Sequence, residues 1–257
     1  MPRSNPGFYD TIEYIGPRPQ KKKRPNNNVF GGWVIVLIAV GLGFWFGQPI
    51  YSAMVTERVT ATPEEAQHLI ATLNRASTPS ARIAAAALAQ SKERISYDPS
   101  YYEIAYPNGD IPTHKGMASD VVVRSFRTIG IDLQKEVHED MKANFGVYPN
   151  FWNATKPDPN IDHRRSQNLH RFLTRHAEDL GPSRNAADYK PGDLVVWGAS
   201  NPDTHHAETH IGIVVPGPGE YSKEPWIVHN NGAGVKWENA LFEYQILGHF
   251  RYPAAKP

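Results

Sequence analysis

The hydrophobic pattern of the chain changes from a helical period to a strand period near Lys190, and this change limits the possible folds most strongly. Before it, apolar residues recur at helical spacing, as over 116–130 and 133–145. After it, short apolar runs separated by turn residues are typical of strands. The expected strands cover 194–197, 209–215, 226–229, 234–237 and 248–252. Helices followed by an antiparallel sheet predict an α+β fold.

A segment without any charged residue, 29–55, precedes this part of the chain. Its run 29–50 is long and apolar enough for one transmembrane helix, with Trp33 and Trp45 near the two ends. A cleaved signal peptide or a buried soluble helix are the alternatives. The basic residues at 21–24 place the N-terminus in the cytoplasm by the positive-inside rule. We therefore expect a single-pass protein of the inner (cytoplasmic) membrane with a periplasmic, or otherwise extracytoplasmic, C-terminal domain.

The rest of the chain divides into three further parts. Residues 1–28 are polar and rich in proline, and we expect a disordered, basic, cytoplasmic tail. Residues 51–94 are expected to form a helical linker hairpin, because Thr62 and Thr78 each precede a proline at a favourable helix start. Residues 95–257 are then the functional domain.

The composition excludes several classes of site. The chain has no cysteine, so it contains no disulfide, no thiolate zinc site and no thiol nucleophile. Its formal net charge of +1 gives no general argument for nucleic-acid binding. Three histidines, His205, His206 and His210, could suggest a metal cluster, but His210 has a better role described below. We predict neither a metal nor another cofactor.

Small residues begin the helix expected at 116–130, where the positive end of the helix dipole would favour a thiolate in an enzyme that carried one. Two histidines, His210 and His229, stand at the ends of neighbouring predicted strands. A catalytic base needs a second group that fixes its tautomer and orientation. Adjacent antiparallel strands can bring two such side chains within reach of each other, opposite the helix start.

The chain resembles two families. The strand motifs PGDLV (191–195), HIGIV (210–214) and IVH (227–229) are similar to those of NlpC-type peptidases, which are papain-fold hydrolases of the bacterial cell wall. More closely, nearly all of 95–252 resembles the bacterial family known as domain of unknown function 1287. The motifs that carry this second resemblance are YPNGD (106–110), IDLQK (131–135), VHEDM (137–141), NIDHRR (160–165) and GHFRY (248–252).

The resemblance implies a papain-like fold and a Cys–His–His mechanism that hydrolyses an amide bond in the stem peptide of peptidoglycan. His210 would be the base and His229 would orient it. The nucleophile position is Ala118, which cannot attack a carbonyl. Three explanations stay open. Alanine could be an engineered replacement of a cysteine, the protein could be a natural one that only binds, or Ser119 could attack instead, although it lies about 100° around the helix from position 118. The alternative function is a non-catalytic, membrane-anchored protein that binds peptidoglycan or acts as a scaffold.

Six residues are expected to bind substrate. One follows the nucleophile position in the family pattern, four share a motif in which arginine suits a substrate carboxylate, and one belongs to an aromatic loop that could line a groove. In order, they are Asp120, Asp162, His163, Arg164, Arg165 and Trp152. The competing interpretations are a capped helix start with solvated arginines, and an aromatic loop that only packs.

Overall fold

A computed structural model describes residues 36–38, 40, 62–199 and 208–253. The predicted tail at 1–28, most of the predicted span at 29–50 and the first part of the predicted linker lie outside these residues. Within the described parts, no helix is both long and apolar enough to cross a membrane. The chain divides into two units, Met1–Thr56 and Glu57–Pro257, and the second unit holds everything that follows.

Two helices, α2 (Pro63–Ala76) and α3 (Pro79–Ser91), begin the second unit as predicted. The Thr62 hydroxyl accepts from the Glu65 N–H at 3.2 Å, and the Glu65 carboxylate accepts from the Thr62 N–H at 2.8 Å. This reciprocal capping box fixes the start of α2. The side chains of Ile83 and Leu88 are fully buried, so α3 belongs to the core of the unit.

Six strands form one sheet in the order β3-β8-β4-β5-β6-β7, and every neighbouring pair is antiparallel. This confirms the predicted α+β class with an antiparallel sheet. The short edge strand β3 was not predicted, because two exposed acidic residues carry no hydrophobic signal. The strands are β3 (Glu178–Asp179), β4 (Leu194–Ala199), β5 (Glu208–Pro216), β6 (Pro225–Asn230), β7 (Val235–Glu238) and β8 (Gln245–Arg251).

Three more α-helices lie in the described part of this unit. These are α4 (Ala118–Arg127), α5 (Leu133–Asn144) and α6 (Ser166–His176). The carboxylate of Asp132 accepts from two N–H groups of the first turn of α5, which confirms the predicted cap. A two-residue parallel pair, β1 (Ser96–Tyr97) with β2 (Lys115–Gly116), lies just before α4.

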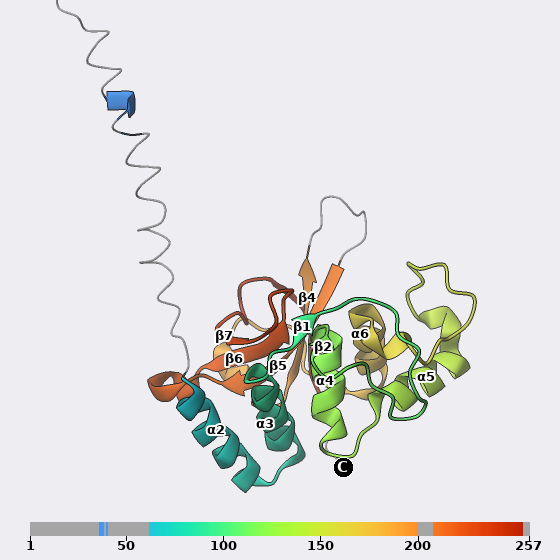
Figure 1. Cartoon of the computed structure of the whole chain (residues 1–257), viewed down its shortest axis with the longest axis horizontal. Coiled ribbons are helices and arrows are strands. Elements are labelled where there is room, and N and C mark those ends of the chain that lie inside the picture. The colour runs from blue at the N-terminus through green and yellow to red at the C-terminus, as the bar shows by residue number, and fades with distance from the viewer. Residues whose placement is uncertain (1–35, 39, 41–61, 200–207, 254–257) are drawn as a thin grey trace, which may run out of the picture. The chain divides into compact units, whose positions relative to one another are not determined.

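The core lies mainly between the sheet and the helices α3, α4 and α6, which all contact β5 (Figure 1). Phe126 of α4 and Ile211 of β5 are fully buried in it. A smaller cluster covers the other face, where Trp197 donates from Nε1 to the carbonyl oxygen of Leu241 at 2.9 Å. Helix α4 is therefore pressed against the strands that carry the two predicted site histidines.

Candidate active site

The residues predicted as the catalytic centre line one cavity, where the start of α4 meets β5 and β6. The cavity has a volume of about 450 Å³, and its wall includes Ala118, His210 and His229. Ala118 is the first residue of α4 and is 4% exposed. A hydrogen bond of 2.9 Å from Asn230 Nδ2 to the carbonyl oxygen of Gly116 ties the end of β6 to the chain just before α4. That bond fixes the helix start relative to the histidines.

His210, His229 and Glu238 form a hydrogen-bonded chain across three neighbouring strands. His210 Nε2 lies 2.7 Å from His229 Nδ1, and His229 Nε2 lies 2.7 Å from Glu238 Oε1. The strand register places Glu238 opposite Ile227, so it is a diagonal neighbour of His229 on the same face of the sheet. His229 is only 3% exposed, so the middle residue of this hydrogen-bonded series is sheltered from water.

The carboxylate of Glu238 determines which ring nitrogens carry hydrogen. An ionised carboxylate only accepts hydrogen bonds, so His229 donates to it from Nε2. In the neutral imidazole of His229, Nδ1 is then an acceptor, and His210 donates to it from Nε2. This leaves Nδ1 of His210 as the basic nitrogen of the chain. If His210 acts as a base, His229 and then Glu238 are placed to orient it.

The surroundings of His210 favour its neutral form. Burial, followed by the neighbouring His229, lowers the pKa of His210 to about 4. Near pH 7 the ring is therefore unprotonated and able to accept a proton. An anion beside it would favour the imidazolium and raise this pKa again.

The start of α4 supplies the complementary partial positive charge. The N–H groups of Ala118 and Ser119 have no partner inside the helix, because the first turn of a helix lacks the preceding carbonyls. Together with the helix dipole they favour a negative charge at this end. The N–H of Met117 is engaged differently, since it donates to Asp120 Oδ2 at 2.6 Å.

Position 118 itself carries only a methyl group. Ser119, the alternative nucleophile, is fully buried, and its hydroxyl donates to the carbonyl oxygen of Arg164 at 2.5 Å. Ser119 is also not part of the cavity wall. The hydroxyl therefore faces the protein interior instead of His210, as the rotation around the helix predicts.

Asp120 and Arg164 form a buried ion pair behind the cavity. Arg164 Nε lies 2.9 Å from Asp120 Oδ1, and the side-chain exposures are 0% and 4%. The guanidinium also donates to the carbonyl oxygens of Ser100 at 2.7 Å and Asp98 at 3.0 Å. Asp120 and Arg164, both predicted to bind substrate, thus use their polar groups on each other and on the backbone. These contacts hold the start of α4 against the preceding loop.

Asp162 and His163 are also interior residues, 2% exposed each. Burial raises the pKa of Asp162 to about 6, and its carboxylate accepts from the N–H of Asp158 at 2.5 Å. Burial, followed by Arg164, lowers the pKa of His163 to about 4. Neither residue lines the cavity of Ala118.

Arg165 and Trp152 meet near the surface. The guanidinium carbon of Arg165 lies 3.8 Å from the centre of the Trp152 ring, which is a cation–π contact. Phe151 packs edge-on against the same indole, with ring centres 5.8 Å apart. The structure therefore separates the six expected substrate-binding residues into a buried group and this surface pair.

No group of three His, Asp or Glu side chains suited to a metal ion occurs among residues 62–199 and 208–253. His205 and His206 lie outside the described residues.

The sequence interpretation missed Glu238 and Asn230. Both lie next to predicted elements: Glu238 follows the strand expected at 234–237, and Asn230 follows the strand expected at 226–229. Pairing those two strands as a hairpin would have brought a carboxylate to the face of His229, and this was the available signal. The hydrogen bond from Asn230 to Gly116 joins residues 114 positions apart, and no local sequence pattern predicts it.

The fold and the site define an α+β domain in which a His–His–Glu chain faces the start of a buried helix. Comparison with known proteins then places the chain: it belongs to the family described as "Domain of unknown function (DUF1287)", whose model matches residues 84–252. The predicted resemblance to this family is confirmed. The chain is 42% identical over 172 residues to the "Uncharacterized protein YijF" of Escherichia coli (strain K12), which covers 66% of this chain and 80% of that protein. No solved structure gives a significant match, and the resemblance to NlpC-type peptidases stays a prediction.

Proposed function

We propose that the domain is a papain-like peptidoglycan amidase or peptidase domain whose nucleophile position is occupied by alanine. The observation that carries this proposal is the meeting of the His210–His229–Glu238 chain and the start of α4 at one cavity. A base that is oriented by two further groups, opposite a helix N-terminus, suits covalent acyl transfer by a thiol. The stem peptide of peptidoglycan is proposed as substrate from the family resemblance.

With cysteine at position 118, each step has a residue to perform it. His210 Nδ1 takes the thiol proton, and the sulfur attacks the carbonyl carbon of the amide. The oxyanion that forms is stabilised by the backbone N–H groups at the start of α4. His210 then gives the proton to the leaving amine, the C–N bond breaks, and a thioester remains. Water, deprotonated by His210, hydrolyses the thioester and releases the acid.

A second function, binding without hydrolysis, is favoured by Ala118 itself. The methyl group leaves the cavity and the histidines in place but removes the nucleophile. The chain with alanine would bind the stem peptide and hold it uncleaved. We propose this as the function of a protein that naturally carries alanine here, with a role in anchoring or scaffolding at the cell wall.

We also propose that the domain is anchored to the inner membrane by the apolar segment 29–50, with the N-terminus in the cytoplasm. The uncharged stretch and the basic residues at 21–24 support this. In cell membranes that contain the full chain, extraction should require detergent. Release by high salt alone would contradict the anchor.

The decisive experiment compares the full chain, purified in mild detergent, as it stands and with Ala118→Cys. Each protein is incubated with purified peptidoglycan, and mass spectrometry identifies the released fragments. We expect hydrolysis only by the Ala118→Cys protein, and its loss when His210→Ala is added. Hydrolysis by the alanine form would refute the thiol mechanism, whereas binding without turnover by both forms would favour the binding function.

A further inference from the structure

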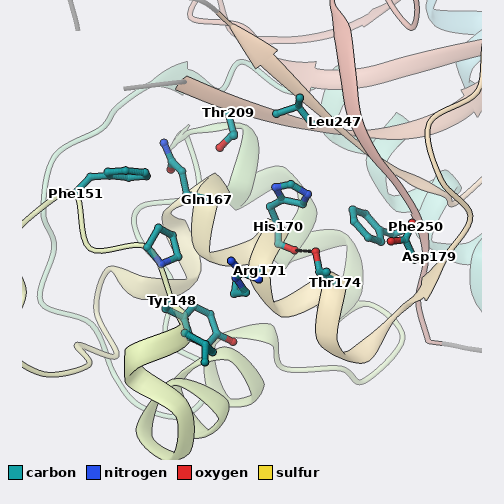
Figure 2. A pocket seen from close by; sticks show the side chains of 12 residues that line it. Tyr148, Phe151, Gln167, His170, Arg171, Thr174, Asp179, Thr209, Leu247 and Phe250 are labelled. Atoms are coloured by element: carbon teal, nitrogen blue, oxygen red, sulfur yellow. Dashed lines mark hydrogen bonds between the residues drawn. The ribbon is translucent and has the colours of Figure 1, made fainter. Parts of the chain in front are cut away.

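A second cavity adjoins the first at Thr209, which lines both. The second cavity has a volume of about 570 Å³ and lies between α6, the loop after α5, and strand β8 (Figure 2). Thr209 directly precedes His210, so the two cavities meet one residue away from the proposed base. The proposed reaction gives no role to this space.

Half of the residues that line the second cavity are apolar or aromatic, and half are polar. Phe250 is buried, whereas Phe151 and Leu247 are exposed side chains at the wall. The hydroxyl of Tyr148 donates to Asp140 Oδ2 at 2.6 Å, which fixes the ring. These side chains give a ligand an apolar surface against which carbon chains or sugar rings can pack.

Arg171 is the cation of this cavity, and it makes no ion pair within the described part of the chain. Five other arginines of the domain form ion pairs with carboxylates: Arg124 and Arg127 with Asp110, Arg164 with Asp120, Arg175 with Asp140, and Arg251 with Asp193. Arg171 is exposed and is not among them. Arg171 lines the cavity, and Figure 2 shows its side chain in the same part of the view as those of His170 and Tyr148. The guanidinium therefore has donors to offer to a ligand.

The neighbouring charges indicate which anion fits. Asp179 also lines the cavity, and its Oδ1 accepts from the N–H of Gly181 at 2.9 Å. One arginine and one aspartate leave the cavity without a large positive charge, which suits a single carboxylate better than a phosphate dianion. His170 also lines the wall, and burial lowers its pKa, so the neutral ring can donate or accept a hydrogen bond.

We propose that the second cavity is a specificity subsite of the same site, which binds a carboxylate-bearing part of the substrate through Arg171. The carboxylate would form a bidentate pair with the guanidinium, while the adjoining carbon atoms pack on Tyr148 and Phe151. This inference rests on the proposed function, because it assumes that one peptide substrate occupies both cavities.

The test measures binding by the full chain as it stands, in which Ala118 prevents turnover. The probes are a purified peptidoglycan stem peptide with free carboxylates and the same peptide with those carboxylates amidated. Calorimetry gives Kd for each probe with the unmodified protein, Arg171→Gln, Arg171→Lys and the control Arg184→Gln. Arg184 is an exposed arginine outside both cavities.

We expect amidation to weaken binding by the unmodified protein about tenfold, the factor that about 1.4 kcal/mol produces. Arg171→Gln should bind both probes equally, with the weaker affinity that the unmodified protein shows for the amidated probe. Arg171→Lys should keep part of the preference for free carboxylates, and Arg184→Gln should match the unmodified protein. Equal binding of both probes by the unmodified protein, or a preference that survives in Arg171→Gln, would overturn the subsite alone. If neither probe binds, the proposed function fails and the subsite fails with it.

Discussion

The buried ion pair of Asp120 and Arg164 offers the sharpest test of how the site is held together. The perturbation is Arg164→Met, which keeps an apolar chain of similar length and removes the guanidinium. In the folded protein this leaves the Asp120 carboxylate buried without its cation. It also leaves the carbonyl oxygens of Ser100 and Asp98 without the donors that Arg164 supplies.

The structure sets the size of the effect. Removing one partner of a fully buried ion pair costs about 3–5 kcal/mol, because the remaining charge keeps its desolvation penalty. A domain of this kind is stable by about 5–15 kcal/mol in total, so the loss takes a large part of its stability. The contacts of Asp120 with Met117 and of Ser119 with Arg164 predict that the start of α4 loosens first.

The assay is urea unfolding of the full chain, followed by circular dichroism and tryptophan fluorescence. A matched control is Lys135→Ala, which removes a pair of 3.9 Å to Glu139 in which both side chains are more than half exposed. Such a surface pair contributes about 0–1 kcal/mol. The double variant Asp120→Asn with Arg164→Met should recover at least about 1 kcal/mol relative to Arg164→Met, since the uncompensated charge is gone.

A free energy of unfolding for Arg164→Met within about 1 kcal/mol of the control would refute this reasoning. It would mean that the carboxylate of Asp120 becomes hydrated, and that other contacts hold α4 in place. Failure of the double variant to recover stability would show instead that the carbonyl contacts of Arg164, and not its charge, carry the effect.

Three further predictions concern the site and its surroundings. In the Ala118→Cys protein, Glu238→Gln should lower the hydrolysis rate at least about tenfold, because an amide can donate to His229 and reverse the tautomers; unchanged turnover would remove Glu238 from the mechanism. The raised pKa of Asp162 (about 6) contributes stability that is present below its unfolded value of 3.8 and is lost as the pH rises through 6. Asp162→Asn should therefore match the unmodified protein in urea unfolding at about pH 4 and exceed it at about pH 8 by about 1–3 kcal/mol. The NMR titration of His210 should have its midpoint near 4 in the unmodified protein and a higher midpoint in the Ala118→Cys protein, whose thiolate favours the imidazolium; identical midpoints would contradict the proximity of the two side chains.

Local patterns were sufficient to predict most of the fold. The caps Thr62, Thr78 and Asp132 are each followed by the helix they predict, because a cap acts on N–H groups only two or three residues away. The strands after Lys190 were found for a similar reason, since alternation and turns are short-range signals. The pairing order of the sheet, by contrast, depends on contacts between distant strands.

The neighbouring residues Arg164 and Arg165 show where sequence reasoning reaches its limit. Both belong to one motif and were expected to share one role. In the fold, Arg164 is 1% exposed and bonded to Asp120, whereas Arg165 stacks on Trp152 near the surface. The two arginines are adjacent on the short turn before α6, yet one side chain points into the interior and the other toward the surface. This difference follows from the packing of α4 against that turn, which the sequence motif does not contain.

The alanine at position 118 links the two proposed functions through a very small structural difference. Cysteine differs from alanine by one sulfur atom, and Ala118 lies at the wall of a cavity that can receive it. The substitution therefore requires no repacking of the core, and in the proposed mechanism the hydrogen-bonded residues His210, His229 and Glu238 would act on the new thiol. Under the proposed function, a domain with Ala118 would keep the groups that orient a substrate but would lack the nucleophile that cleaves it. Under the proposed function, the residue at this single position would decide between hydrolysis and binding, with no other change in the described site.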